Sequence, residues 1–384
     1  MKTQHTDIAI LGLGAMGLSA LHVAAQRGLT VLGIDQFDPP HIQGSSHGET
    51  RLIREAYSED ARYIPLIRRA LDLWRQHAAE MDGDIFHETG VQYFGPADDP
   101  RIQATRASAA AYDIPLTQTG PDTSDGKAPF ELPKGWDHFH ETRAGYLGVE
   151  TYLSQVRQRA EAKGATCLTG RTIRTAAHKN GRWRIELDDR WIEAETAIFT
   201  AGPWSHELIP ELQKHLVLER NTLHWLEAPA DDRFTRAPGF RPFVAHLPRN
   251  KWIYGFPANE DGLVKIAEHS TGERFSRWQD MDRAIRDKDR SRIEDFCRTY
   301  APSLGPIRKS VTCMYTMSPD GNFIIDRHPQ DKSGVLAAGL SGHGYKFAPV
   351  IGEILVKLAM QEDPGFDLSL FSLSRFAGQP AQSA

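Results

Sequence analysis

The sequence predicts a mixed α/β protein that combines a doubly wound α/β domain with a second domain built on an antiparallel sheet. Three observations support this fold class. A glycine-rich turn joins an apolar strand to a helix at residues 7–27, a second strand, glycine-rich turn and helix follow at 334–360, and short strands separated by turn residues lie between them. The 384 residues are enough for two domains with substantial cores.

The first elements form a βαβ unit. Residues 7–13 are an apolar run typical of a buried parallel strand, residues 15–27 predict a helix, and residues 30–35 predict the second strand. Gly28 falls just after the helix, where a C-terminal glycine is expected. This order of elements is typical of a Rossmann-like domain.

The middle of the chain adds two amphipathic helices and a meander. Residues 61–78 and 151–163 carry apolar side chains at helical spacing. Residues 165–202 contain short strands separated by Asn-Gly and Asp-Asp turn signals. We therefore expect a β-meander inserted into the doubly wound sheet.

The later elements lead to a prediction of domain boundaries. Residues 205–300 mix strands with a charged helix at 278–300, and a strand at 334–339 and a helix at 348–360 follow. Because glycine-rich units lie near both ends of the chain, we expect a discontinuous nucleotide-binding domain. It would comprise residues 1–88, 145–214 and 311–384, with residues 89–144 and 215–310 forming the substrate domain.

The composition excludes several classes of protein. The net charge is −5 and no run of five basic residues occurs, so we expect no nucleic-acid partner. Cys167, Cys297 and Cys313 are far apart and lack the spacing of a zinc site, so we expect neither a disulfide framework nor a metal.

The apolar start of the chain has two interpretations. Residues 8–25 follow a lysine and end in small residues, as in a signal peptide. The glycines and the following strand favour the βαβ unit instead. No later segment reaches about 18 uninterrupted apolar residues, the length that a membrane span needs. We expect a cytoplasmic protein without a membrane segment.

The glycine turn has the spacing of a dinucleotide-binding motif. Gly12 permits the tight turn, Gly14 lets the backbone approach a pyrophosphate, and Gly17 allows the helix to pack closely on the strand. Asp35 ends the second strand, where a carboxylate can accept hydrogen bonds from ribose hydroxyls. An ordinary strand–turn–helix is the simpler alternative, and the motif alone does not separate FAD from NAD.

Four segments together resemble the monomeric sarcosine oxidase and N-methyltryptophan oxidase family, FAD-dependent amine oxidases of the D-amino acid oxidase superfamily. The similarity extends almost from end to end, and the order and spacing of the segments are more specific than any one of them. The segments are His47-Gly48-Glu49-Thr50-Arg51-Leu52-Ile53-Arg54, Tyr254-Gly255-Phe256-Pro257 with Lys265 and His269, Cys313-Met314-Tyr315-Thr316, and Ser341-Gly342-His343-Gly344-Tyr345-Lys346-Phe347.

The resemblance implies an FAD-dependent oxidase of secondary amines on amino acids, with the flavin held covalently. It implies that the sulfur of Cys313 is bonded to the 8α-methyl group of the flavin. A thiolate is a competent nucleophile for such a bond. Without the family, Cys313 would be interpreted as a small buried apolar residue.

The first segment supplies flavin and substrate contacts in this resemblance. Arg51 lies against the flavin ring, with His47 and Thr50 beside it, and Arg54 pairs with the substrate carboxylate. A planar guanidinium suits that task. On sequence alone, Arg51 and Arg54 would share one face if the segment were helical, and a solvated basic face is the simpler interpretation.

The last segment supplies a second cation. By resemblance, Lys346 binds the substrate carboxylate together with Arg54, while Gly342 and Gly344 let the backbone approach the flavin. Two cations offset the cost of burying a carboxylate. A surface lysine after a glycine turn is the alternative.

The segment with Tyr254, Lys265 and His269 supplies, by resemblance, the residues that face the flavin and the substrate amine. Lys265 lies in a strand-like stretch, and the resemblance places it under the flavin, where its charge favours electron transfer to oxygen. Tyr254 and His269 would line the pocket of the substrate amine. Taken alone, Lys265 could be an exposed strand lysine, and His269 a structural histidine.

The implied reaction uses only an amino acid and O2, in a protein that the family suggests is a monomer. A hydride equivalent leaves the substrate, the imine hydrolyses to an aldehyde and a primary amino acid, and O2 becomes hydrogen peroxide. For an N-methyl substrate the aldehyde is formaldehyde.

Departures from the family pattern leave the substrate open. Ser46-His47 stands where a His-His pair is usual, and Ala128-Pro129-Phe130 replaces an expected Arg-Trp-Pro turn. Sarcosine, N-methyltryptophan and a cyclic imino acid such as pipecolate or proline all remain candidates. A flavin dehydrogenase that passes electrons to a carrier protein or a quinone is a second interpretation of the same motifs. A non-catalytic nucleotide-binding sensor or an NAD-dependent enzyme is a third.

Overall fold

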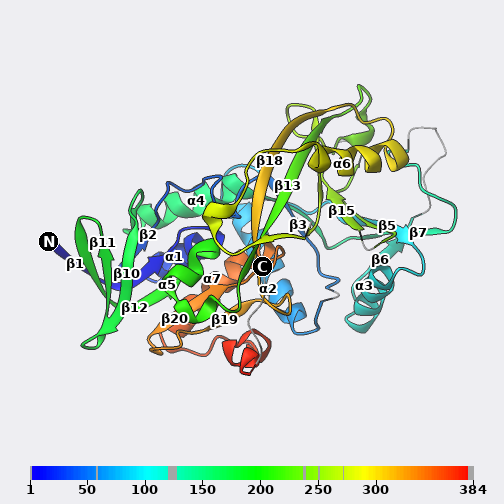
Figure 1. Ribbon diagram of the computed structural model, residues 1–384. Coiled ribbons are helices and arrows are strands. Elements are labelled where there is room, and N and C mark those ends of the chain that lie inside the picture. The colour runs from blue at the N-terminus through cyan, green and yellow to red at the C-terminus, as the bar shows by residue number, and fades with distance from the viewer. Residues whose placement is uncertain are drawn as a thin grey trace.

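The computed structural model describes residues 2–57, 59–119, 128–236, 239–249, 251–270 and 272–378. Two large sheets organise the chain, and they lie in different halves of the molecule (Figure 1). The N-terminal strand and the last long helix lie in the same half, so segments from both ends of the chain contribute to it.

The first sheet has eight strands and a parallel centre. Its order is β10-β11-β12-β1-β2-β9, with β20 on β12 and β19 on β20. The central pairs β12·β1, β1·β2, β2·β9 and β12·β20 are parallel. The strands are β1 (Lys2–Leu11), β2 (Val31–Ile34), β9 (Thr166–Leu168), β10 (Ile173–Lys179), β11 (Arg182–Leu187), β12 (Arg190–Phe199), β19 (Ile324–Arg327) and β20 (Gly334–Ala338). The predicted βαβ unit and the meander are therefore both present, because apolar runs and turn residues specify them locally.

Helices pack on this sheet through a continuous apolar core. They are α1 (Ala15–Gln26), α2 (Tyr63–Glu80), α4 (Val149–Ala162) and α7 (Ala348–Ala359). α1 and α7 approach closely at Gly352, where a Cβ would lie 2.7 Å from the carbonyl carbon of Ser19. The predicted helix after Gly12 and the helix at the C-terminal end are thus neighbours in space, which brings the two glycine turns together.

The second sheet has nine strands and is mostly antiparallel. Its order is β17-β13-β16-β15-β14-β5-β7-β6, with β18 also paired to β13, and only β14·β5 is parallel. The strands are β5 (Val91–Pro96), β6 (Leu116–Gln118), β7 (Trp136–Glu141), β13 (Val217–Glu227), β14 (Phe243–Leu247), β15 (Lys251–Gly255), β16 (Leu263–Glu268), β17 (Glu273–Phe275) and β18 (Ile307–Met317). β18 crosses the domain boundary predicted at residue 310.

One face of this sheet packs on α6. Apolar side chains of β14 and α6 (Asp287–Tyr300) share one core. A small sheet consists of β3 (Thr50–Ile53), β8 (Gly145–Gly148) and β4 (Phe86–His87), and β3 lies between the two halves of the molecule (Figure 1). Two further helices are α3 (Pro100–Ala111) and α5 (Ser205–Leu208).

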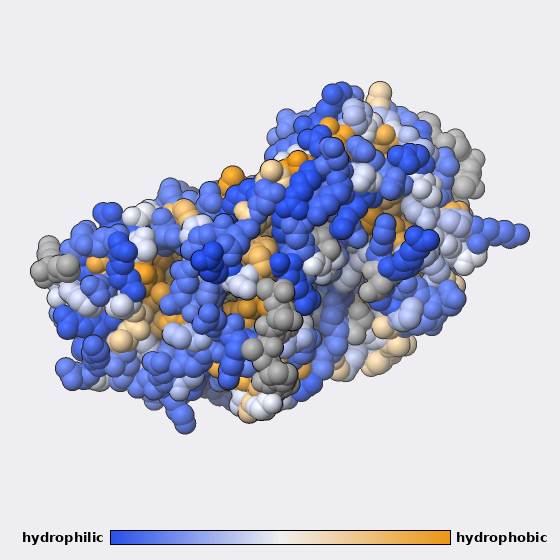
Figure 2. All heavy atoms as spheres, in the orientation of Figure 1, coloured by the Kyte–Doolittle hydropathy of each residue, from blue (hydrophilic) through white to orange (hydrophobic). Residues whose placement is uncertain are grey.

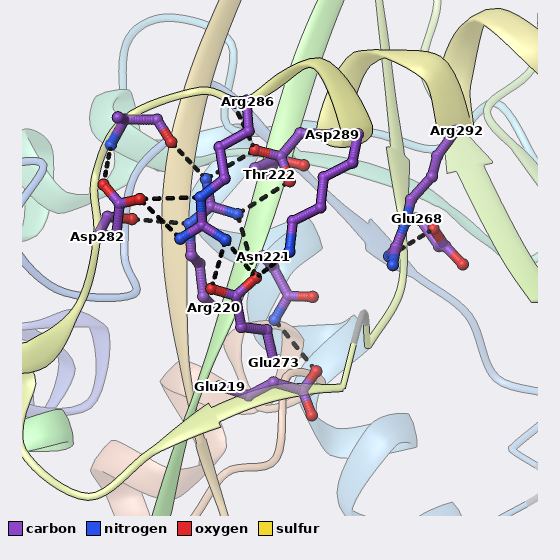
Figure 3. Close-up of polar contacts among 12 residues, drawn as sticks. Glu219, Arg220, Asn221, Thr222, Glu268, Glu273, Asp282, Arg286, Asp289 and Arg292 are labelled. Atoms are coloured by element: carbon purple, nitrogen blue, oxygen red, sulfur yellow. Dashed lines mark hydrogen bonds and ion pairs between the residues drawn. The ribbon is translucent and has the colours of Figure 1, made fainter.

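The helix predicted at 278–300 is shorter than expected. Only Asp287–Tyr300 is α-helical, preceded by a single 3-10 turn at Trp278–Asp280. The buried Arg220 of β13 explains the loop, because its guanidinium donates to the carbonyls of Asp282 and Ala284 and to the carboxylate of Asp289 (Figure 3). This ion pair spans 69 positions, so no local pattern could predict it.

The surface is largely hydrophilic on the face shown in Figure 2, with small separated apolar areas. Within the described ranges, no helix is long and apolar enough to span a bilayer.

Candidate active site

A long cavity joins the two glycine turns. It encloses about 1390 Å³, including the part open to solvent. Its walls come from segments far apart in the sequence: residues 12–16, 34–36, 39–41, 44–46, 171–173, 200–204 and 337–342, together with Arg51, Tyr315, Gly344 and Tyr345. The predicted positions Gly12, Gly14, Asp35, Arg51 and Gly342 therefore line one continuous space.

The N-terminal turn has the close packing that its glycines predict. Gly12 has a φ of +98°, and a Cβ on it would lie 2.6 Å from the carbonyl oxygen of Thr200. A Cβ on Gly17 would lie 1.9 Å from the Gly12 carbonyl oxygen. Gly14 differs, because a Cβ there would meet only the Ser46 hydroxyl, at 3.6 Å. Gly14 thus presents bare backbone beside the cavity, where α1 begins and unpaired N–H groups favour an anion.

Asp35 supports this turn from the second strand. One of its carboxylate oxygens accepts the Leu13 N–H at 2.8 Å, and the other accepts the Phe37 N–H at 2.9 Å. Each oxygen keeps a further lone pair for a hydroxyl donor. Asp35 therefore fixes the turn and can still serve the predicted ribose contact.

The cavity also contains polar atoms that fit a dinucleotide cofactor. Trp204 Nε1 and Thr316 Oγ1 are buried, line the cavity and have no hydrogen-bond partner among the described residues. The Nε2 atom of the buried His47, next to the cavity residue Ser46 in the chain, also has no partner among the described residues, but His47 does not line the cavity. Buried polar groups are rarely left unpaired, so a ligand with donors and acceptors along its length suits these walls.

Arg51 organises the loop at one end of the cavity. Its guanidinium donates to the carbonyls of Ser45 at 3.0 Å, His47 at 2.7 Å and Thr50 at 2.9 Å. The segment is strand β3 rather than a helix, so the condition under which Arg51 and Arg54 would share a helical face is not met. Pairing of β3 with β8 across almost a hundred positions decides this, and a four-residue apolar run cannot reveal it.

Lys265 reaches the same loop from β16. Its side chain is buried, and Nζ donates to the Gly48 carbonyl at 2.5 Å, the Thr50 carbonyl at 2.8 Å and Thr50 Oγ1 at 3.3 Å. Burial lowers the pKa of Lys265 well below its usual value, and the charge of Arg51 lowers it further. The three acceptors match the three donors of an ammonium group.

Cys313 completes this cluster from β18. Its sulfur is buried and lies 4.0 Å from Arg51 Nη2 and 4.0 Å from the Ser45 carbonyl. Burial raises the pKa of the Cys313 thiol, while the charges of Arg51 and Lys265 act in the opposite direction. Arg51, Lys265 and Cys313, which are far apart in the sequence, thus lie in one cluster at this end of the cavity.

The two predicted carboxylate-binding cations contact one tyrosine ring. The guanidinium carbon of Arg54 lies 4.5 Å from the centroid of Tyr57, and Nζ of Lys346 lies 5.4 Å from it. Burial lowers the pKa of Lys346 to about 7, and its Nζ donates to the His343 carbonyl at 2.8 Å. Arg54 pairs with the Glu59 carboxylate at 2.5 Å. Burial would raise the pKa of Glu59, but Arg54 holds it at about 2.

His269 and Tyr254 also come together. The His269 ring centroid lies 6.5 Å from that of Tyr254 and 4.4 Å from that of Trp252, and His269 Nδ1 lies 3.5 Å from Tyr315 Oη. Burial lowers the pKa of His269 to about 3, so its imidazole is neutral near pH 7. His269, Tyr254 and Trp252 lie outside the walls of the long cavity, whereas Tyr315 is part of them.

Sequence reasoning missed Tyr57, Trp252 and the role of Tyr315. Tyr315 lines the cavity, and a Cβ on Gly342 would lie 2.4 Å from its ring. Strand alternation after Cys313 could have indicated Tyr315, because positions two apart share a face. Tyr57 and Trp252 carry no motif, and their partners are distant in the sequence.

Comparison with known proteins agrees with these features. The family model of FAD-dependent oxidoreductases matches residues 7–358. The chain is 35% identical over 372 residues to an N-methyl-L-tryptophan oxidase of Citrobacter koseri, covering 96% of this chain and 99% of that protein. A relative of the same name from Yersinia pestis is also 35% identical over 373 residues.

Solved structures share the fold at lower identity. The amino acid oxidase NikD superposes with a TM-score of 0.85 at 20% identity, covering 96% of this chain and 97% of its own. The L-proline dehydrogenase of P. horikoshii gives a TM-score of 0.82 at 16% identity, covering 99% of this chain and all of the other. The α/β fold, the cavity between the glycine turns and the full-length match together show that this chain belongs to the family of FAD-dependent oxidoreductases.

Proposed function

We propose that this enzyme oxidises the secondary amine of an N-methyl or other N-alkyl amino acid, with FAD held along the cavity between the two glycine turns. The observation that supports this most is the pair Arg54 and Lys346 on the ring of Tyr57. The relatives named N-methyl-L-tryptophan oxidase, similar over almost the full chain, support the same class of substrate.

Arg54 and Lys346 would bind the substrate carboxylate. The guanidinium offers a planar fork, and Lys346 adds a second cation. Glu59 accepts from Nη2 of this guanidinium, so a substrate carboxylate would share Arg54 with Glu59 or replace it there. Neutral His269 and Tyr254 would hold the amine, because an uncharged imidazole does not repel it.

When bound, FAD supplies the two-electron redox chemistry. Loss of a hydride equivalent from the carbon next to nitrogen turns the substrate amine into an imine. Water then hydrolyses the imine to an aldehyde, formaldehyde for an N-methyl group, and the primary amino acid. The chain's own contribution is to fix the orientation of the substrate and to exclude other arrangements.

Lys265 and Arg51 would favour oxygen as the electron acceptor. Arg51 carries a positive charge at this site, where charge acts more strongly than in water. Lys265, whose pKa burial lowers, donates to the same Thr50 carbonyl and would serve as a proton donor beside that charge. The two electrons and two protons of each turnover would reduce O2 to hydrogen peroxide. We further propose that Cys313 holds the flavin covalently, since its sulfur lies beside Arg51 at the same end of the cavity. The monomeric state and the cytoplasmic location stay predictions from the sequence.

Anaerobic mixing tests the proposal. The purified enzyme is mixed without oxygen with sarcosine, N-methyltryptophan, other N-methyl amino acids, pipecolate and proline, and flavin absorbance is followed. We expect an N-methyl amino acid to bleach the flavin, and air to restore the colour with release of peroxide. Failure of every N-alkyl amino acid to bleach it would contradict the proposed substrate class. Bleaching without reoxidation by air would favour the dehydrogenase.

A further inference from the structure

Glu141 is a fully buried carboxylate that the proposed reaction does not use. It is the last residue of β7 and is 0% exposed. One oxygen accepts the backbone N–H groups of Glu55 and Ala56, the latter at 3.2 Å. The other accepts the hydroxyl of Tyr93, on the neighbouring strand β5, at 3.1 Å. Both oxygens are therefore fixed by donors from separate elements.

The backbone that Glu141 holds comes directly after Arg54. β3 ends at Ile53 and α2 begins at Tyr63, so the intervening N–H groups belong to no strand or helix. Buried N–H groups need an acceptor, and an irregular turn must find one in a side chain. The conformation of this turn therefore depends on one carboxylate from the other sheet.

The same turn carries the proposed carboxylate-binding contacts. Arg54 Nη1 donates to the Ala56 carbonyl at 2.9 Å, and the N–H of the same residue donates to Glu141. Ala56 therefore links the guanidinium of Arg54 to the Glu141 carboxyl group. The next residue, Tyr57, supplies the ring that faces both Arg54 and Lys346. A displacement of the turn would move the guanidinium and the ring together.

The side chain of Glu55 serves a different purpose. It bonds to Arg68 at 2.6 Å and to Arg143 at 2.9 Å, both partly exposed. Only its backbone N–H is bound by Glu141. The buried carboxyl group that accepts the N–H groups of the turn is thus that of Glu141. Burial raises the pKa of Glu141 to about 7, and the nearby charge of Arg54 acts in the opposite direction.

We infer that Glu141 is a positioning residue for the amino acid site: by fixing the turn at residues 55–57 it directs the guanidinium of Arg54 to the substrate carboxylate. The inference rests on the proposed function. Misplacement of a binding group by about 1 Å can cost as much as about 100-fold in activity. Glu141 would therefore act on substrate affinity through Arg54, without touching the substrate.

The test compares two substitutions in the flavin-loaded enzyme. Glu141→Asp withdraws the acceptor by one methylene, whereas Glu141→Gln keeps an oxygen in place for the two N–H groups. We expect Glu141→Asp to raise KM for the amino acid about tenfold with kcat changed less than about threefold, and Glu141→Gln to stay within about threefold of the wild type. An unchanged KM in Glu141→Asp, or a loss confined to kcat, would overturn the inference.

A second measurement separates this inference from the proposed function. Isobutyrate, a carboxylate without an amine, is titrated against the oxidised enzyme while flavin absorbance is followed. We expect about tenfold weaker binding in Glu141→Asp, even if no N-methyl amino acid proves to be a substrate. Equal affinity in both proteins would refute the positioning role.

The matched control is Glu219→Asp. Glu219 is equally buried and lies on the same sheet, but its partners are Asn221 (Figure 3) and Arg274. We expect its KM to match the wild type, and an equal rise in KM would refute a specific role for Glu141. Should Glu141→Asp not fold, Tyr93→Phe removes the hydroxyl that fixes the second oxygen. KM should then rise about two- to fivefold, and no change would refute the inference.

Discussion

At the scale of single residues, chemistry depends on which side chains are brought into contact. Cys313 is the clearest case, because an apolar strand cysteine becomes a candidate attachment point for the flavin only beside Arg51 and Lys265.

We expect the wild-type flavin to stay with the polypeptide after acid precipitation, and Cys313→Ala to release it. Absorbance of the supernatant and the pellet measures this. Cys297→Ala is the matched control, since Cys297 is also buried but lies on α6, in the core that α6 shares with β14. Release of flavin from the wild type would refute the attachment.

At the scale of elements, two glycines of the N-terminal turn have different roles: Gly17 allows close packing of the helix, and Gly14 allows a ligand to approach the backbone. Gly17→Ala places a Cβ against the Gly12 carbonyl, so we expect a loss of about 1–3 kcal/mol in the free energy of unfolding. Gly14→Ala meets no close atom, so we expect an unchanged unfolding free energy but less flavin in the purified protein. Thermal unfolding and flavin absorbance measure the two effects. Equal stability of the two variants would contradict this division of roles.

The elements also show which parts of the fold could be predicted from the sequence. The βαβ unit, the meander and the last helix could be predicted, because apolar periodicity and turn residues act over short distances. The order of the nine-stranded sheet could not, because strands such as β5 and β14 pair across about 150 positions. The same limit applies to the site: motifs indicated Arg51, Arg54 and Lys265, but the ring of Tyr57 and the carboxylate of Glu141 emerge only from tertiary contacts.

At the scale of the whole molecule, buried histidines make the fold sensitive to acid. His22 and His77 are the best-defined pair, with ring centroids 5.8 Å apart in the core between α1 and α2. Both ring nitrogens of His22 have no partner among the described residues. Burial lowers the pKa of each histidine to about 4, and the charge of one disfavours a charge on the other. His47, His246 and His269 are buried in the same way.

The sign of the pH effect follows from proton binding. Between about pH 6.5 and pH 4 the unfolded chain binds protons that the folded chain rejects, so the free energy of unfolding falls as the pH falls. Each such histidine contributes a slope of about 1.4 kcal/mol per pH unit within this window. We expect the unfolding temperature to drop steeply from pH 6.5 to pH 4.5, and His22→Leu to make that drop smaller. His5→Leu is the control, because His5 is mostly exposed in its side chain. An identical pH dependence of His22→Leu and the wild type would show that the core pair does not govern acid stability.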